Sequence, residues 1–328
     1  MNIQGKKILV TGAAGFIGSH LAEQLVEAGA SVSAFVRYNS KSSWGWLESS
    51  PRKKDITVIS GDIRDYDSVK AAVKDAQIVF HLAALIGIPY SYQSPLAYIK
   101  TNIEGTYNVL QAARELGVER VIQTSTSEVY GTARYVPINE EHPLQPQSPY
   151  SATKIGADNL ALSFYHAFNL PVVVARPFNT YGPRQSARAV IPTIITQILS
   201  GQKEITLGNL APTRDLNFVL DTVKGFIKIA ENDDILGEII NVGSGTEISI
   251  GDLAKLIAKL LQTEVHIKQD QHRIRPGKSE VERLVCDHGK IQRLTDWKPC
   301  YTLEEGLTIT IDWLKENLQI YKPEQYNV

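Results

Sequence analysis

Short apolar runs alternate with longer amphipathic stretches over the first half of the chain. The amphipathic stretches carry apolar residues at helical spacing and cover residues 17–28, 66–74, 102–116 and 151–168. The apolar runs between them cover residues 7–12, 31–36, 56–62, 77–84, 120–125 and 171–177. Uniformly apolar strands that alternate with helices are typical of parallel sheets covered on both faces. The pattern therefore predicts an α/β protein with a doubly wound parallel sheet.

The alternation loosens after Pro177. Turn-rich stretches such as FNTYGPRQSARA and LGNLAPTRD then separate shorter elements. We therefore expect one domain over residues 1–177 and a smaller α/β domain over residues 178–328. A segment near residues 216–244 is expected to return to the first domain.

Composition narrows the class of partner. The 34 Lys and Arg residues nearly balance the 35 Asp and Glu residues, so no overall field would draw the chain to nucleic acid or to an anionic membrane. Cys286 and Cys300 have neither a disulfide pattern nor metal-ligand spacing, and the seven histidines are scattered. No leader pattern or membrane-length apolar run is evident. We expect a cytoplasmic protein that binds a small molecule and no metal.

A glycine-rich turn lies between the first predicted strand and the first predicted helix. In TGAAGFIG, residues 11–18, Gly12, Gly15 and Gly18 are spaced G-x-x-G-x-x-G. Glycines at this spacing permit a sharp turn, close approach of a pyrophosphate to the helix N-terminus, and close packing of the helix on the sheet. The position of the motif predicts dinucleotide binding, with a merely structural tight turn as the alternative.

The residues after the second and third strands bear on which dinucleotide binds. NAD-binding proteins usually carry a carboxylate at the end of the second strand, where this chain has Arg37. Arg37 could meet the 2′-phosphate of NADP, or could be a solvated surface residue. We expect NADP, with NAD as the alternative. Asp62 could accept a hydrogen bond from the adenine amine, or could cap the next helix.

A second motif, SPYSATK, spans residues 148–154 at the start of a predicted helix. Tyr150 and Lys154 are four residues apart and should project from the same helix face. The ammonium group would stabilise a phenolate, and a positive nicotinamide would add to this effect. Tyr150 then becomes a plausible base for a sugar hydroxyl that loses hydride. A Tyr and a Lys at this spacing are also common on helix surfaces, so the motif gains weight from the glycine-rich turn that precedes it.

Several ordered motifs together resemble the extended short-chain dehydrogenase/reductase family. They are TGAAGFIG, HLAA (81–84), TNIEGT (101–106), TSEVYG (126–131), YSATK (150–154), RPFNTYGPR (176–184), PTRDLNFVLD (212–221) and RPGKSEVERL (275–284). The resemblance implies a Rossmann domain that binds NAD(P) and keeps it through each turnover, a C-terminal nucleotide-sugar domain, and a homodimer formed through a helix pair. It makes Tyr150 the base, Lys154 the ribose-binding group and Thr126 the partner of the O4 hydroxyl. The other cofactor-contacting residues that it implies are Phe16, Ile17, Ile63, Leu82, Ala83 and Ala84.

Glu128 distinguishes among the reactions of this family. Sugar 4-epimerases usually have small apolar residues where this chain has Ser127 and Glu128. GDP-mannose-type 4,6-dehydratases have Thr-Ser-Glu, as at Thr126 to Glu128, and after C4 oxidation the glutamate removes the C5 proton and protonates the departing C6 hydroxyl before hydride returns to C6. UDP-glucuronate decarboxylases also carry Thr-Ser-Glu but usually lack the pair found here at Arg214 and Asp215. The resemblance therefore favours a 4,6-dehydratase, with decarboxylase and epimerase as alternatives.

Candidate substrate ligands lie in the second half. Arg184, Arg214 and Arg275 carry guanidinium groups that match phosphate oxygens, although any of them could be an exposed surface residue. Asn179 matches a family position that contacts the substrate diphosphate. The chain looks most like bacterial dehydratases of UDP- or GDP-N-acetylglucosamine in deoxyamino-sugar pathways. A non-catalytic dinucleotide sensor is the alternative of a different class, but such proteins tend to lose the catalytic tyrosine or lysine.

Overall fold

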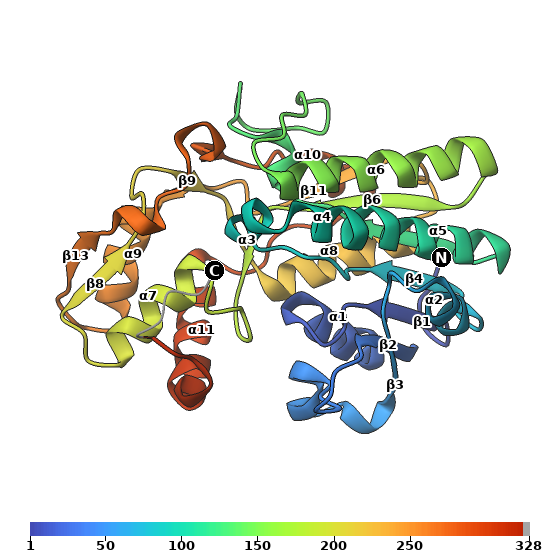
Figure 1. Ribbon diagram of the computed structural model, residues 1–328, viewed down its shortest axis with the longest axis horizontal. Coiled ribbons are helices and arrows are strands. Elements are labelled where there is room, and N and C mark those ends of the chain that lie inside the picture. The colour runs from blue at the N-terminus through green and yellow to red at the C-terminus, as the bar shows by residue number, and fades with distance from the viewer. Residues whose placement is uncertain (324–328) are drawn as a thin grey trace.

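The computed structural model describes residues 1–323 and centres on a seven-stranded parallel sheet (Figure 1). The strand order is β11-β6-β5-β4-β1-β2-β3. The strands are β1 (Lys7–Thr11), β2 (Ser31–Arg37), β3 (Ile56–Gly61), β4 (Ile78–His81), β5 (Arg120–Thr124), β6 (Val172–Pro177) and β11 (Ile239–Val242). The order reverses between β1 and β4, the position at which α/β sheets bind ligands beyond the carboxyl ends of their strands. The prediction of a doubly wound parallel sheet is confirmed.

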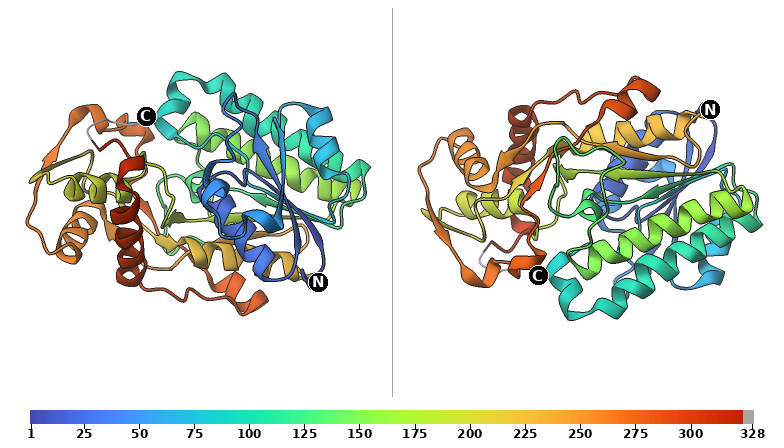
Figure 2. Two further views of the ribbon diagram at one scale, coloured as in Figure 1. Left: turned by 90° about the horizontal axis from the view of Figure 1, so that it is seen from below. Right: turned by 90° about the horizontal axis from the view of Figure 1, so that it is seen from above.

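Helices cover both faces of the sheet, as Figure 2 also shows. On one face α1 (Phe16–Glu27) packs against α8 (Val219–Glu231), and on the other α2 (Tyr66–Val73), α5 (Gly105–Glu115) and α6 (Pro149–Phe168) pack side by side. Strand β1 supplies Ile8 and Val10 to the first core and Leu9 to the second. Because both faces are covered, the inner strands β1, β4 and β6 are buried at nearly every position, whereas the edge strand β3 has exposed residues at Thr57 and Ser60.

One helical stretch begins earlier than its pattern predicts. The segment predicted as a helix over residues 102–116 begins instead as α4 (Pro95–Tyr98), continues as a π-helical stretch (Ile99–Glu104) and ends as α5. Pro95 occupies the first turn of α4, where its missing N–H leaves no hydrogen bond unmade. The π-helical stretch shifts the spacing of the apolar residues. A regular helical period is therefore present in the sequence only over the second half of this helical segment.

The later half of the chain forms three small sheets and further helices. Strands β7 (Asn179–Tyr181) and β10 (Leu216–Phe218) pair in parallel; β12 (Ile248–Ser249), β9 (Thr213–Arg214) and β14 (Arg283–Leu284) form a second sheet; β8 (Glu204–Leu207) and β13 (His266–Gln269) form a third. The remaining helices are α3 (Ile88–Gln93), α7 (Val190–Leu199), α9 (Ile250–Leu260), α10 (Gly289–Thr295) and α11 (Leu303–Asn317).

One later segment joins the large sheet. Helix α8 packs on this sheet, and β11 pairs with β6, with Ile239 opposite Val174. The division of the chain into domains at residue 177 stays a prediction. Among residues 1–323, none of the helices is both long enough and apolar enough to cross a bilayer.

Candidate functional site

The glycine-rich turn lies where the strand order reverses. Gly12 has a φ of 72°, and a Cβ there would lie 2.8 Å from the backbone nitrogen of Ala83. A Cβ on Gly18 would lie 2.3 Å from the carbonyl oxygen of Gly12. Gly15 is the N-cap of α1 and has no side chain to cap it. The first amide groups of this helix therefore suit an anionic ligand, and the cradle fits the pyrophosphate of a dinucleotide.

Two alanine substitutions separate the folding role of this turn from its binding role. Gly12→Ala is expected to lower the midpoint of thermal unfolding, because its Cβ meets the Ala83 backbone and its φ is positive. Gly15→Ala, at a φ of −84° and with its Cβ 3.2 Å from the Gly12 carbonyl oxygen, is expected to lower the unfolding temperature less than Gly12→Ala does. It should bind NAD and NADP at least about tenfold more weakly, because the added methyl group crowds the N-terminus of α1, where an anion is expected to bind. Calorimetric titration measures both ligands. Unchanged binding by Gly15→Ala would remove the turn as the dinucleotide site.

Charged side chains surround the ends of β2 and β3. Arg37 is exposed at the end of β2. Asp62 accepts hydrogen bonds from the backbone nitrogen of Arg64 at 3.0 Å and from its Nε at 2.9 Å. This hydrogen bonding, chiefly from the Arg64 side chain, lowers the pKa of Asp62, and Arg37 contributes. The N-cap of α2 is Asp65, so the alternative that Asp62 caps this helix is wrong. Ile63 lies beside this cluster and is buried.

The segment after β4 is fixed by side chains that sequence reasoning did not single out. Thr11 Oγ1 accepts hydrogen bonds from the backbone nitrogens of Leu82 and Ala83, both at 3.1 Å. Asn102 Oδ1 accepts from the backbone nitrogen of Leu85 at 2.8 Å, and Asn102 Nδ2 donates to Thr153 of α6 at 3.0 Å. The TNIEGT motif thus connects the segment that contains Ala84 to the helix that carries Tyr150 and Lys154.

Two buried histidines have structural surroundings. His81 lies between Thr11 Oγ1 at 2.7 Å and Thr106 Oγ1 at 3.1 Å, and His20 contacts the carbonyl oxygen of Pro183 at 3.0 Å. Burial lowers the pKa of His81 to about 3 and that of His20 to about 4. Both rings therefore stay neutral in the fold under conditions in which an exposed histidine takes up a proton.

This neutrality predicts a loss of stability in mild acid. An unfolded chain binds protons at both positions near pH 6.5 and the folded chain does not, so the free energy of unfolding should fall as the pH drops from about 6.5 to 4. Urea titrations at several pH values measure this trend. His20→Gln should flatten it, whereas His266→Gln, at an exposed position, should not. Equal trends in wild type and His20→Gln would contradict this account.

Helix α6 places Tyr150 and Lys154 on one buried face. The helix begins at Pro149, and Ser148 and Ser151 form a reciprocal cap. Tyr150 is 7% exposed, and Lys154 Nζ donates to the carbonyl oxygen of Thr124 at 2.5 Å. Burial lowers the pKa of Lys154 to about 8, and burial raises the pKa of Tyr150. Burial therefore outweighs the effects that lower the pKa of Tyr150, and its lowering by Lys154 stays a prediction.

Thr126 and Glu128 adjoin this pair. Thr126 caps a single helical turn (Ser127–Tyr130), and its Oγ1 accepts a hydrogen bond from the backbone nitrogen of Glu128 at 3.2 Å. Thr126 also hydrogen-bonds Tyr150, which opposes the rise in the pKa of Tyr150 caused by burial. Glu128 is only 8% exposed, and its charge acts on both Tyr150 and Arg214. Ser127 beside it is also buried. The structure thus gathers a carboxylate, a phenol and a guanidinium.

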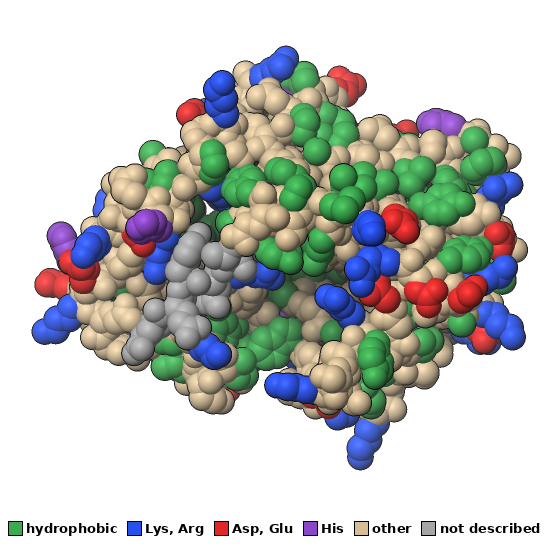
Figure 3. Space-filling model, viewed as in Figure 1, with side chains coloured by type: hydrophobic (Ala, Val, Ile, Leu, Met, Phe, Trp, Pro, Cys, Tyr) green, Lys and Arg blue, Asp and Glu red, His purple; other side chains and the backbone are tan. Residues whose placement is uncertain are grey.

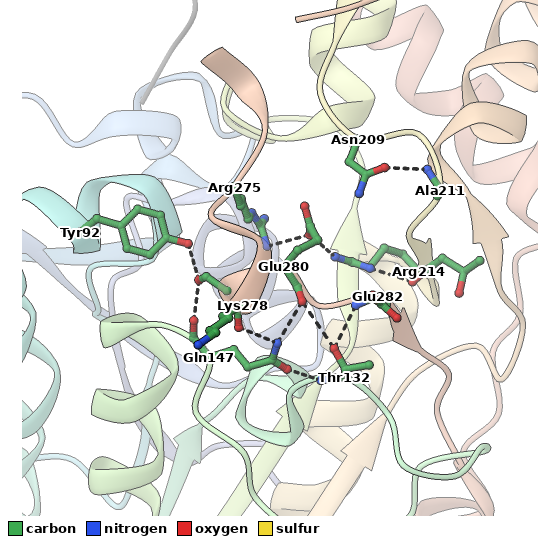
Figure 4. Close-up of polar contacts among 12 residues, drawn as sticks. Tyr92, Thr132, Gln147, Asn209, Ala211, Arg214, Arg275, Lys278, Glu280 and Glu282 are labelled. Carbon is green, nitrogen blue, oxygen red and sulfur yellow. Dashed lines mark hydrogen bonds and ion pairs between the residues drawn. The ribbon is translucent and has the colours of Figure 1, made fainter. Parts of the chain in front are cut away.

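The arginines predicted as substrate ligands divide into two groups. Arg214 Nη2 lies 3.5 Å from Glu280 Oε1, and Arg275 Nη1 lies 3.7 Å from the same oxygen. Figure 4 shows these guanidinium groups on either side of Glu280. Arg184 is directed elsewhere, since its Nη2 pairs with Glu23 of α1 at 2.9 Å and its Nη1 donates to Ser19. The structure therefore does not bring Arg184 to Glu280.

Two further polar groups have contrasting surroundings. The Oδ1 atom of Asn179 is buried and has no hydrogen-bond partner within residues 1–323. Asp215, in contrast, has hydrogen bonds to both of its carboxylate oxygens. Its carboxylate accepts from the backbone nitrogens of Ser244, Gly245 and Cys286 and from the Ser244 hydroxyl. Of the Arg214-Asp215 pair, only Arg214 is thus available for chemistry at the site.

A buried ion pair near Lys154 is not evident from the short sequence motifs. Asp158 Oδ2 lies 3.1 Å from Arg176 Nη2, and both side chains are 1% exposed. Asp158 follows Lys154 by one helical turn, and its charge favours the protonated form of that lysine. The spacing on α6 could have indicated Asp158. Arg176 comes from β6, and only the fold brings it there.

Groups of three or more potential metal-ligating side chains are absent from residues 1–323.

Comparisons with known proteins agree on one family. The model of the family described as GDP-mannose 4,6 dehydratase matches residues 9–310. A dTDP-glucose 4,6-dehydratase of Streptomyces antibioticus is 32% identical, covering 96% of this chain and 94% of that protein. A UDP-N-acetyl-alpha-D-glucosaminuronate decarboxylase of Bacillus cytotoxicus is 35% identical, covering 95% and 98%. The structure of dTDP-glucose 4,6-dehydratase from Streptomyces venezuelae with NAD and TYD bound superposes with a TM-score of 0.85 at 29% identity, covering 97% of this chain and 100% of that one.

Proposed function

The chain belongs to the GDP-mannose 4,6-dehydratase family, within the extended short-chain dehydrogenases/reductases, and from this premise we propose that it is a nucleotide-sugar 4,6-dehydratase. UDP- or GDP-N-acetylglucosamine is the proposed substrate. The observation that carries the proposal is the buried carboxylate of Glu128 beside Tyr150. A carboxylate at this position supplies the proton transfers that elimination of water requires and that a 4-epimerase does not need.

The proposed cofactor is a nicotinamide dinucleotide. Gly12, Gly15 and Gly18 would hold its pyrophosphate, and Lys154 would contact its ribose. Arg37 supports NADP, whereas the NAD bound to the Streptomyces venezuelae enzyme supports NAD. The chemistry that either supplies when bound is the acceptance and return of a hydride. The positive charge of a bound nicotinamide ring, together with that of Lys154, would lower the pKa of Tyr150 against the effect of burial.

The roles of the chain's own side chains follow from their positions. Tyr150 removes the proton of the O4 hydroxyl, and Thr126 orients that hydroxyl. Once C4 is a ketone, Glu128 removes the C5 proton and then donates it to the departing C6 hydroxyl, so one carboxyl group takes up and gives back a single proton. When hydride returns to C6, C5 takes up a proton that is in exchange with solvent, and Tyr150 gives up the proton that it took from O4. The products are then a 4-keto sugar with a methyl group at C6 and one water. Asn179, Arg214 and Arg275 would bind the diphosphate.

Decarboxylation of a nucleotide-linked uronate is the second candidate. It is favoured by the similarity to the Bacillus cytotoxicus decarboxylase and by the Thr-Ser-Glu stretch at Thr126 to Glu128. Decarboxylases usually lack the pair found here at Arg214 and Asp215. Because Asp215 is hydrogen-bonded to the backbone and so has a structural role, only Arg214 is evidence against decarboxylation.

Mass spectrometry of reactions separates these candidates. The purified protein would be incubated with UDP-GlcNAc, GDP-GlcNAc, GDP-mannose, dTDP-glucose and UDP-glucuronate. Loss of one water from a single donor is the expected result, and it identifies the nucleotide and the sugar. In deuterated water the product should carry one deuterium at C5. Loss of carbon dioxide from UDP-glucuronate, or a product of unchanged mass, would overturn the dehydratase assignment.

A homodimer is part of the proposal. Apolar side chains gather over α3, α4 and α5 on the face shown in Figure 3. Leu96 is 61% exposed, Ile99 47% and Tyr107 44%. A contiguous patch of this kind is typical of an interface.

A cytoplasmic location, which suits an enzyme with only two cysteines, is likewise proposed.

Charge placed in this patch is expected to produce a monomer. Ile99→Glu should halve the mass found by size-exclusion chromatography with light scattering, because a carboxylate would be desolvated at the interface. Ile320→Glu is the control, since Ile320 is equally exposed, at 52%, but lies near the C-terminus. A wild-type monomer, or an Ile99→Glu dimer, would exclude this surface as the interface.

A further inference from the structure

Glu280 lies between the two arginines that are proposed to bind the substrate diphosphate (Figure 4). Its side chain is 13% exposed, and those of Arg214 and Arg275 are 9% and 27% exposed. Charge-assisted hydrogen bonds usually measure about 2.7–2.9 Å. Both contacts here are longer, at 3.5 Å and 3.7 Å, and Arg275 Nη1 is buried with no hydrogen bond to residues 1–323. Arg214 Nη1 donates to the carbonyl oxygen of Thr213 at 2.9 Å, and Arg214 Nη2 makes only a long hydrogen bond to Glu280. The carboxylate thus offsets part of the positive charge and leaves Arg275 Nη1 unsatisfied.

Hydrogen bonds hold the backbone around Glu280, whereas its carboxylate makes the two long contacts to Arg214 and Arg275. Gln147 Nε2 donates to the carbonyl oxygens of Glu280 at 2.9 Å and Lys278 at 3.1 Å. The Ser279 hydroxyl lies 2.6 Å from the hydroxyl of Tyr92 on α3. Residues 278–280 are therefore attached to the segment just before α6 and to α3. Displacement of the carboxylate is therefore expected to involve the Glu280 side chain and not this backbone.

The charges around this side chain make such an exchange favourable. Burial is the main cause that lowers the pKa of Arg214, and the positive charge of Arg275 lowers it further, whereas the carboxylates of Glu128 and Glu280 raise it. The guanidinium groups of Arg214 and Arg275 therefore repel each other. Glu280 relieves the repulsion with one negative charge. A nucleotide diphosphate brings more charge and more acceptor oxygens, and so suits both planar guanidinium groups at once.

We propose that Glu280 is a specificity-determining residue that holds the place of the substrate diphosphate and is displaced from Arg214 and Arg275 when the nucleotide sugar binds. This inference rests on the diphosphate role that the proposed function gives to the two arginines. A ligand must therefore offer both guanidinium groups a better partner than the internal carboxylate. The residue weakens binding of every phosphate ligand and selects for those that span both groups.

Glu280→Gln tests the proposal by the sign of its effect. The variant keeps the size of the side chain and removes its charge, so inorganic pyrophosphate and UDP, GDP or dTDP should bind about fivefold more tightly, since two weak ion pairs no longer need to be broken. Calorimetric titration gives the dissociation constants. Glu282→Gln is the matched control, because Glu282 is exposed two positions further along the same segment and its loss should change binding less than about twofold.

Three results would overturn the inference. Weaker binding by Glu280→Gln would mean that the carboxylate orients the arginines for the ligand, and unchanged binding would mean that it stays in place. Equal tightening in Glu280→Gln and Glu282→Gln would mean a general effect of charge. If Glu280→Gln does not fold, Glu280→Asp serves instead, since its shorter side chain withdraws the carboxylate and should also tighten binding. Binding of pyrophosphate does not depend on any reaction of the sugar. The binding measurement therefore tests the role of Glu280 even if the dehydratase assay shows no activity.

Discussion

Glu128→Gln is expected to lower kcat by about 10²- to 10⁴-fold while binding of the dinucleotide is unchanged. The amide fills the same space as the carboxyl group but cannot remove the C5 proton or protonate the departing hydroxyl. Glu128 is buried beside Tyr150, so no water-borne base readily replaces it. The glycine-rich turn is a separate part of the chain, and this separation is why cofactor affinity should survive.

The first oxidation step distinguishes this role from a structural one. Glu128→Gln should still oxidise C4, so the absorbance of reduced nicotinamide should accumulate in a single turnover. Tyr150→Phe should prevent even that step, because it lacks the hydroxyl that takes the O4 proton. Dehydration at the wild-type rate by Glu128→Gln, or loss of dinucleotide binding, would refute the assigned role. A dinucleotide sensor would respond to neither substitution.

Asp158→Asn is expected to lower the free energy of unfolding by about 3–5 kcal/mol. The change leaves Arg176 in the interior without its counter-charge. Arg176 donates to Asp158 through Nε and Nη2, both at 3.1 Å, and through Nη1 to the hydroxyl of Tyr130 at 3.0 Å. Ser125 also donates to Asp158, so the substitution disturbs a connected network. Urea denaturation followed by circular dichroism measures the loss.

Two comparisons show that the loss comes from the unpaired charge. Asp312→Asn removes an exposed partner of Lys315, with side chains 63% and 52% exposed, and should change stability by less than about 1 kcal/mol. Combining Asp158→Leu with Arg176→Met should recover much of the loss, because an apolar pair needs no counter-charge. A loss for Asp158→Asn as small as that for Asp312→Asn would contradict the expectation.

The sheet could be predicted because its inner strands are buried on both faces and are therefore mainly apolar. Helix boundaries were harder where the helix itself is irregular. The stretch from Pro95 to Glu115 changes its period at residues 99–104, so its apolar spacing is regular only towards its end. Local signals sufficed at Ser148 and Pro149, which begin α6 by capping and by a fixed φ.

The candidate site could be predicted only where its residues lie in short motifs. Tyr150 and Lys154 share one helix face, so their spacing places them. Arg184 carries the same chemistry as Arg214 but pairs with α1, a contact across 161 positions. Glu280 depends on Gln147, 133 positions away. Sequence patterns report local periodicity and give no measure of such distant pairings.

The last strand of the large sheet has a consequence for synthesis. Strand β11 is made more than sixty residues after β6, the strand whose edge it covers. While the ribosome produces the intervening residues, the nascent chain displays β6 as an open, apolar edge to other molecules in the cell. Fragments that stop before residue 239 should therefore aggregate even though they contain six of the seven strands. Chaperone dependence should be greatest during that interval of translation.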